Sequence, residues 1–154
     1  TGFQEEQSVE TRSLENKGER DLLEKHLNIL LADTKFDINT SIGVVSPYKA
    51  QVLALQEQLG EEIVHSYDIS VNTIDSFQGQ ERDVIYISMV RSNDDGVIGF
   101  LQDLRRMNVA MTRARKKLVI IGDSATLGNH KFYQDFFSYA EEVEAYKSAF
   151  EYLY

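Results

Sequence analysis

The stretch VNTIDSFQGQERDVIYISMVRSN, residues 71–93, decides the fold. Its second half contains a nearly continuous apolar run at residues 84–90, which is typical of a strand covered on both faces. A second strand is predicted at residues 69–73, and only ten residues separate Thr73 from Val84. Ten residues are few for a helical crossover, so the sequence allows either a hairpin or a one-turn crossover between these strands.

Upstream of this stretch, an amphipathic helix, a strand and a second helix follow one another. Asn16 and Glu19 have the spacing of a capping pair, so a helix is expected to begin there. Ser46-Pro47 predicts another helix start, with serine as the N-cap and proline as the first helical residue. The apolar positions supporting these elements are Leu23, Leu27, Leu30 and Leu31, then residues 42–45, then Val52, Leu55 and Leu59 up to a stop at Gly60.

Downstream, the same alternation of helices and strands continues. A helix is expected over residues 102–116, a strand over 118–121, and a last helix with Phe132, Phe136, Tyr139 and Val143 on its apolar face. The helix over 102–116 is expected to bury Leu104, Met107, Ala110, Met111 and Ala114. The aromatic tail beyond it either covers the sheet or forms an interface. Apolar strands alternating with amphipathic helices predict an α/β domain whose mainly parallel central sheet is flanked by helices.

Composition limits the kinds of partner. A chain of 154 residues is one domain by length, and its net charge of −9 argues against binding nucleic acid by bulk electrostatics. Residues 105–117 nevertheless hold six Lys or Arg and no Asp or Glu. No apolar run is long enough to span a membrane, there are no cysteines, and the histidines show no metal-ligand spacing. We therefore expect an intracellular protein, cytoplasmic or nuclear, with no membrane partner and no metal site of its own.

The first polar segment that suits a ligand is Ser46-Pro47-Tyr48-Lys49. The start of a helix presents free backbone N–H groups that suit a phosphate, and Ser46 and Lys49 add a hydroxyl and a charge. Tyr48 adds a face on which a base can stack. The alternative is a capped helix with a surface tyrosine and lysine, which residue types alone favour.

The second segment, residues 73–83, is polar although it lies between two strands that are predicted to be buried. Gly79 lets the backbone approach a ligand closely, and Glu81 is able to accept hydrogen bonds from a sugar hydroxyl. The alternative is a polar inter-strand loop in which Gly79 sets a turn. Spacing does not decide between the two.

The third segment is the basic run at residues 105–115. Arg106 and Arg113 are seven residues apart, so on the predicted helix both project from one side, together with Val109 and Ala110, which should be partly buried. Arginines beside an apolar face usually extend to solvent or pair with carboxylates. The alternative is a guanidinium directed at an anion across an interface, since its planar fork suits phosphate oxygens.

Taken together, these segments resemble a known family. Residues 71–93, followed by IGFLQDLRRMNVAMTRARKKLVIIGD at 98–123, closely resemble motifs V and VI of superfamily 1 helicases of the RNA-surveillance, replication-nuclease and senataxin group. IGVVSPYKAQ at 42–51 resembles the motif IV segment of that group. The similarity covers residues 1–125 in order.

The resemblance implies a RecA-like, three-layer fold related to the phosphate-loop NTPases, and therefore a short crossover after Thr73. It also implies that ATP lies between two RecA-like domains while single-stranded DNA or RNA crosses both. Arg113 then matches the arginine finger, and Gly79 and Glu81 match positions that face the nucleotide. The positions that match the nucleic-acid side of motifs IV and V are Ser46, Pro47, Tyr48, Thr73 and Ser76, with Lys49 added by its charge.

The phosphate loop Gly-x-x-x-x-Gly-Lys-Ser/Thr does not occur in these residues. We therefore expect residues 1–154 to be one C-terminal RecA-like helicase domain within a larger protein. Its cofactor, ATP with Mg²⁺, is then bound only together with an N-terminal RecA-like domain, and the chain alone is expected to be inactive. The alternative is a catalytically dead nucleic-acid- or protein-binding module on the same fold.

Overall fold

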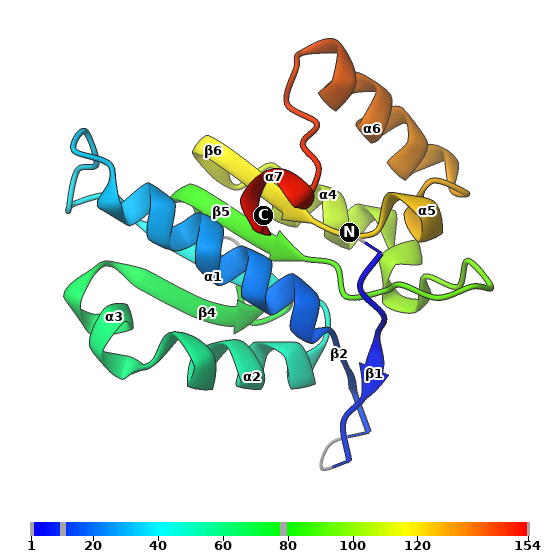
Figure 1. Ribbon diagram of the computed structural model, residues 1–154, viewed down its shortest axis with the longest axis horizontal. Coiled ribbons are helices and arrows are strands. Elements are labelled where there is room, and N and C mark those ends of the chain that lie inside the picture. Colours follow the sequence, from blue (N-terminus) through cyan, green and yellow to red (C-terminus); the bar gives the residue numbers. More distant parts are fainter. Residues whose placement is uncertain (1, 10–11, 78–79, 154) are drawn as a thin grey trace.

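The computed structural model describes residues 2–9, 12–77 and 80–153, and its central feature is a four-stranded parallel sheet (Figure 1). A short two-stranded antiparallel hairpin, β1 and β2, projects from one side of the molecule. The elements in chain order are β1 (Glu6–Gln7), β2 (Leu14–Glu15), α1 (Lys17–Ala32), β3 (Ile42–Ser46), α2 (Lys49–Leu59), α3 (Glu61–Ser66), β4 (Ile69–Thr73), β5 (Arg82–Ser88), the 3₁₀ helix η1 (Gly99–Gln102), α4 (Leu104–Met111), β6 (Ala114–Ile121), α5 (Ser124–Leu127), α6 (Lys131–Glu142) and α7 (Phe150–Leu153).

The strand order is β4-β3-β5-β6, so β3 lies between the two strands of the deciding stretch. Ile42 is paired with Ile69 of β4 and with Val84 of β5, both in parallel register. The sequence allowed a hairpin between these two strands, and that alternative is wrong because both pair with β3. The link between β4 and β5 is a crossover, as the family resemblance implies.

This crossover, residues 74–81, returns the chain from the carboxyl end of β4 to the amino end of β5. Ile74 and Phe77 are buried in it, and Ile74 N–H donates to the Ser46 carbonyl at 3.1 Å. The Phe77 ring lies against Gly43 in β3, where a Cβ would come within 3.0 Å of a ring carbon. A glycine at this position lets the described part of the crossover pass close to the sheet.

Helices and the crossover cover both faces of the sheet. On one face α1 and α2 pack against Val44 and Tyr86, and in Figure 1 α1 lies in front of the strands. On the other face the crossover, η1 and α4 pack against Val45 and Ile87. Because neighbouring strand residues point to opposite faces, coverage on both sides explains the continuous apolar run. The predicted three-layer α/β fold is confirmed.

The predicted helix start at Asn16 is confirmed, since its side chain accepts a hydrogen bond from the Glu19 N–H at 3.1 Å. The Glu19 side chain, however, reaches the end of β5. Its Oε1 accepts hydrogen bonds from the Ser88 hydroxyl at 2.8 Å and from the Val90 N–H at 2.9 Å. Val90 has a φ of +70°, unusual for a β-branched residue, and Asn16 also donates to its carbonyl. These two side chains thus hold the chain where it turns away from the sheet.

Two helix predictions are wrong in their limits. Ser46 ends β3, Tyr48 is the N-cap residue, and α2 begins at Lys49. The helix expected over 102–116 is divided into η1 and α4, and β6 already begins at Ala114. Pairing of this segment with β5 satisfies its backbone groups, and an edge strand tolerates charged side chains, so tertiary pairing overrides the helical pattern.

The apolar faces predicted for two helices are also partly wrong. Met107 and Ala110 of α4 are buried as expected, but Leu104 and Val109 are exposed. The last predicted helix exists as α6, yet Tyr133 is its buried side chain, while Tyr139 is 61% exposed. Tyr133 is held inward because its hydroxyl donates to the Leu101 carbonyl at 2.6 Å. Within the described part of the chain, no helix combines the length and apolarity that crossing a membrane requires.

Candidate nucleotide and nucleic-acid sites

The predicted site residues fall into two groups at opposite ends of the sheet. The group predicted for nucleic acid lies where β3 and β4 end, and it consists of Ser46, Pro47, Tyr48, Lys49, Thr73 and Ser76. Glu81 and Arg113 lie where β5 and β6 begin, and the Arg113 carbonyl accepts the backbone N–H of Arg82 at 3.1 Å. Gly79 lies outside the described residues.

The polar residues at the carboxyl ends of β3 and β4 differ in how far they are exposed to solvent. The Ser46 side chain is fully buried, and its Oγ accepts the Tyr48 N–H at 3.3 Å. The Thr73 hydroxyl donates to the Ser76 hydroxyl at 3.0 Å and accepts the Ser76 N–H at 3.3 Å. Ser76 and Lys49 are exposed, and Pro47 is half-buried. Lys49 and Ser76 are therefore the accessible polar side chains of this group, and the binding role of the whole group stays a prediction.

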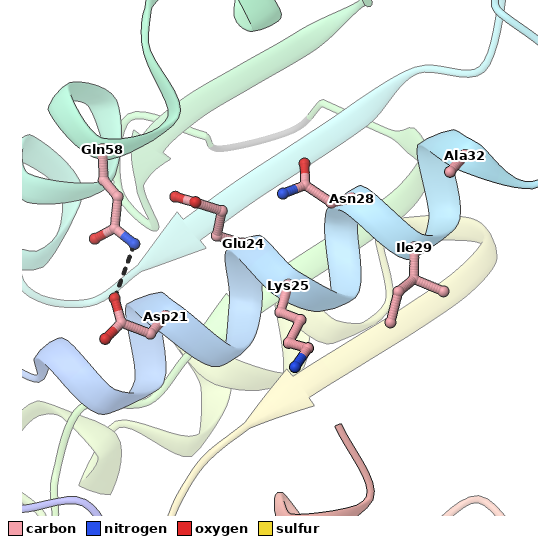
Figure 2. Close-up of a pocket in the computed structure, with 7 residues that line it drawn as sticks. All are labelled: Asp21, Glu24, Lys25, Asn28, Ile29, Ala32 and Gln58. Carbon is pink, nitrogen blue, oxygen red and sulfur yellow. Dashed lines mark hydrogen bonds between the residues drawn. The ribbon is translucent and has the colours of Figure 1, made fainter. Parts of the chain in front are cut away.

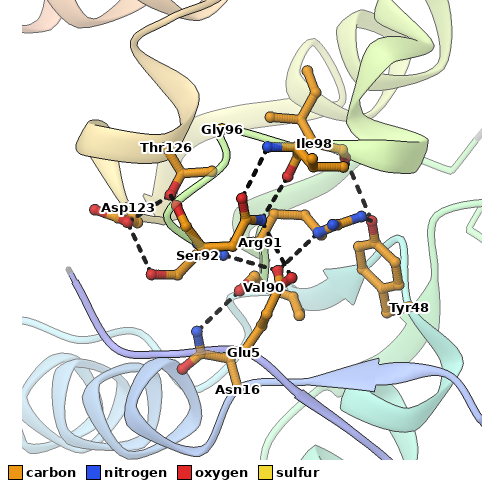
Figure 3. Close-up of polar contacts among 12 residues, drawn as sticks. Glu5, Asn16, Tyr48, Val90, Arg91, Ser92, Gly96, Ile98, Asp123 and Thr126 are labelled. Carbon is orange, nitrogen blue, oxygen red and sulfur yellow. Dashed lines mark hydrogen bonds and ion pairs between the residues drawn. The ribbon is translucent and has the colours of Figure 1, made fainter.

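The Tyr48 side chain is buried, with only 3% of it exposed. Its hydroxyl donates to the Ile98 carbonyl at 3.4 Å and accepts from Nη1 of Arg91 at 3.3 Å (Figure 3). Burial raises the pKa of this hydroxyl above its ordinary value. The surface tyrosine of the capped-helix alternative is thus wrong, and direct stacking of a base on Tyr48 stays a prediction.

Sequence reasoning missed the charged pair that holds Tyr48. Nε of Arg91 donates to Oε2 of Glu5 at 2.8 Å, and the backbone N–H of Ser92 donates to the same carboxylate oxygen at 3.0 Å (Figure 3). Burial lowers the pKa of Arg91, but its bonds to Tyr48 and Glu5 outweigh that effect and leave it raised. The sequence did contain one sign of this role, because Arg91 directly follows the apolar run at residues 84–90, where a buried strand ends.

At the other end of the sheet, Arg113 has an unusual environment. Its Nε is buried and has no hydrogen-bond partner within the ranges that the structure describes. Glu81, which precedes β5, is exposed. A buried guanidinium N–H without a partner is costly unless a ligand or another surface supplies an acceptor. The arrangement is therefore suited to an anion.

Arg106 does not share this environment. Its Nε pairs with Asp75 of the crossover at 3.1 Å and lies 3.6 Å from Asp103. Since α4 ends at Met111 and Arg113 lies beyond it, the prediction that Arg106 and Arg113 project from one side of a helix is wrong. Arg106 instead connects the crossover to α4.

A pocket lined by residues of α1 and by Gln58 of α2 is separate from both groups (Figure 2). Asp21 and Gln58 line it and are joined by a hydrogen bond of 3.0 Å. None of the predicted site residues lines this pocket.

The fold and these two groups define a class of protein, a RecA-like domain of the kind found in nucleic-acid motors. A parallel sheet covered on both faces is crossed from one end to the other by a polar segment, with an unpaired arginine at one end. The sequence matches the family described as AAA domain over residues 1–125. The chain belongs to this family, and within it to the superfamily 1 helicases of the RNA-surveillance, replication-nuclease and senataxin group, so the family prediction is confirmed.

Several relatives carry helicase or DNA-binding names. The chain is 42% identical to the DNA polymerase alpha-associated DNA helicase A of Saccharomyces cerevisiae over 131 residues, 82% of this chain and 18% of that protein. It is 46% identical to an uncharacterized ATP-dependent helicase of Methanocaldococcus jannaschii over 121 residues, 79% of this chain and 17% of that protein. It is 36% identical to the DNA-binding protein SMUBP-2 of Mus musculus over 152 residues, 99% of this chain and 15% of that protein. The chain thus spans less than a fifth of the length of these relatives.

Proposed function

We propose that this chain is the second RecA-like domain of an ATP-dependent helicase that acts on single-stranded DNA or RNA. The observation that carries the proposal is the buried, unpartnered Nε of Arg113 beside the start of β5, where Glu81 is exposed. A buried guanidinium N–H without an acceptor is suited to donate a hydrogen bond to a phosphate oxygen. The family of the chain and the printed name of its archaeal relative support ATP as the source of that phosphate.

In this proposal Arg113 is the arginine finger. Its fixed positive charge stabilises the charge that develops on the transferring γ-phosphoryl group, and it contributes nothing to the reaction until that group is in place. Glu81, directly before the neighbouring strand β5, accepts hydrogen bonds from the ribose or lies near the phosphates. Gly79 belongs to the same proposed site.

The residues of this chain do not by themselves make a complete nucleotide site. A phosphate loop supplies the lysine and the hydroxyl that bind phosphate and Mg²⁺, and residues 1–154 contain no such sequence. We infer that an N-terminal RecA-like domain of the same protein supplies them and that this chain alone does not hydrolyse ATP. Mg²⁺, when bound, would neutralise charge on the phosphates, and Arg113 would supply a further positive charge.

The carboxyl ends of β3 and β4 form the proposed nucleic-acid side. Ser76 and Lys49 are exposed there, and Thr73 orients Ser76 through two hydrogen bonds. The crossover joins this side to Glu81, so one segment of eight residues touches both proposed ligands. A shift of the crossover between nucleotide states would couple ATP hydrolysis to the affinity for single-stranded nucleic acid.

The test is an Arg113→Ala substitution in a protein that joins this chain to a phosphate-loop domain. ATPase activity stimulated by nucleic acid is expected to fall by about 10³- to 10⁵-fold, with ATP binding largely retained. Lys116→Ala, which removes an exposed cation of the same basic residues 105–117, is the matched control and should retain most of the activity. Unchanged turnover in Arg113→Ala would remove the finger assignment.

The catalytically dead module makes a different prediction. It requires that the joined protein bind a single strand with no ATP hydrolysis in either the wild type or the variants. Measurable turnover in the wild-type joined protein, and none in the isolated chain, separates the two functions.

A further inference from the structure

Phe100 is a large aromatic side chain that remains open to solvent at the carboxyl ends of the strands. It lies in η1, and 59% of it is exposed. Its ring centroid is 5.3 Å from that of the buried Tyr48, with the two ring planes tilted by 40°. One side of the Phe100 ring therefore rests on a fixed neighbour, while much of the ring is accessible.

The backbone around Phe100 is held on both sides. Gly99 has a φ of +51°, and the Arg91 guanidinium occupies the place where a Cβ on Gly99 would project. The Tyr48 hydroxyl donates to the Ile98 carbonyl, and the Tyr133 hydroxyl donates to the Leu101 carbonyl. These contacts fix η1 so that Phe100 stays exposed, although Ile98 and Leu101 on either side are buried.

Two exposed cations lie close in sequence to Phe100 or to its neighbour Tyr48, and the exposed carboxylate of Asp103 is paired with Arg106. Lys49 directly follows Tyr48 and is exposed, and Arg105, at the start of α4, is exposed as well. Neither cation forms a salt bridge with any described residue. The cores of protein–protein interfaces are depleted in lysine, whereas sites for single strands combine stacking rings with positive charges. The chemistry around Phe100 therefore favours a nucleic-acid strand over an apolar protein partner.

We propose that Phe100 is a base-stacking platform for one nucleobase of a single strand, with Lys49 beside the backbone of that strand. In this site Tyr48 is a positioning residue. Its buried ring packs against the Phe100 ring and does not contact the base. The inference rests on the proposed nucleic-acid side of the domain and adds Phe100, which is not among the site residues named above. Because every base has a stacking face, such a contact tolerates any sequence.

The test compares two strands of equal length and charge, binding to the 154-residue chain at low salt. One is a fluorescein-labelled oligothymidylate, and the other carries the same backbone with abasic sites. Phe100→Ala is expected to bind oligothymidylate about 5- to 150-fold more weakly than the wild type, which is the loss that one stacked base corresponds to. Its affinity for the abasic strand should be unchanged, because that strand has nothing to stack.

Two further variants complete the design. Phe100→Trp should retain or strengthen binding of oligothymidylate, and Leu104→Ala, which truncates a nearby side chain that is 40% exposed, should leave it unaltered. Circular dichroism shows whether each variant is folded. Equal affinity of wild type and Phe100→Ala for oligothymidylate overturns the inference. A similar loss for both strands also overturns it.

Lys49→Ala separates this inference from the proposed function on which it rests. Loss of a backbone contact weakens binding of both strands alike. If Lys49→Ala has this effect while Phe100→Ala has none, the proposed nucleic-acid side stands and only the stacking platform fails. If the wild-type chain binds neither strand at low salt, both fail together.

Discussion

Replacing Glu19 by glutamine is expected to change how the stability of the domain depends on pH. The Glu19 side chain is fully buried between α1 and β5, where it accepts hydrogen bonds from Ser88 and Val90. Burial raises its pKa from the ordinary value of 4.5 to about 7, because the two hydrogen bonds offset only part of the cost of removing the charge from water, and Asp123 also raises the pKa. Glutamine has nearly the same shape and does not titrate in this range.

The sign and the size of the effect follow from that pKa. Between pH 4.5 and about 7 the folded state retains the Glu19 proton while the unfolded state releases it. The free energy of unfolding therefore falls as the pH rises through this window, and the contribution is fully present only below pH 4.5. At about 1.4 kcal/mol for each pKa unit, the loss on reaching neutral pH is about 3 kcal/mol.

The measurement is urea unfolding of the wild type and of Glu19→Gln at a series of pH values. The stability of Glu19→Gln relative to the wild type should rise by about 3 kcal/mol from acidic to neutral pH. Glu62→Gln, at an exposed position of α3, makes the same change in net charge and serves as the control. A difference between Glu19→Gln and the wild type that does not vary with pH would refute the reasoning.

Two further predictions concern packing and buried hydrogen bonds. Gly43→Ala is expected to destabilise the domain by about 1–3 kcal/mol in urea unfolding, because the new Cβ would lie 3.0 Å from the Phe77 ring. Phe77→Leu should reduce that additional cost in a double-mutant cycle, and strict additivity would contradict the contact. Gln51→Leu should cost about 2–4 kcal/mol, since the buried amide binds both the N–H and the carbonyl of Asn16. Gln56→Leu removes one part-buried hydrogen bond made by an exposed residue of the same helix, and an equal loss there would argue against a special role for Gln51.

Several features of this protein were determined by the sequence itself. The apolar run of β5 predicts a strand covered on both faces because its pattern requires burial on each side. The helix start at Asn16 depends on a contact to Glu19, only three residues away, so it is local enough to be read from the chain. The order of the polar segments, with Glu81 and Arg113 among them, was sufficient to predict the family.

The limits of the helices were less predictable, for a physical reason. Residues 114–117 have a pattern compatible with a helix, but β5 offers this segment a ladder of backbone hydrogen bonds. Such bonds join residues about thirty positions apart, as Arg82 and Ala114 show. No periodicity within the segment records them, so the predicted helix continued past its true end at Met111.

Only the tertiary structure decided how the candidate site is arranged. The strand order β4-β3-β5-β6 sends the crossover from one end of the sheet to the other, which places Glu81 and Arg113 together and away from Ser76 and Lys49. Tertiary contacts also bury Tyr48 and leave Phe100 exposed, because Arg91 and the Ile98 carbonyl, directly before η1, bind the tyrosine hydroxyl. The sequence contains the candidate binding groups and the strands that carry them. Their grouping depends on contacts between distant residues, which exist only once the sheet has formed.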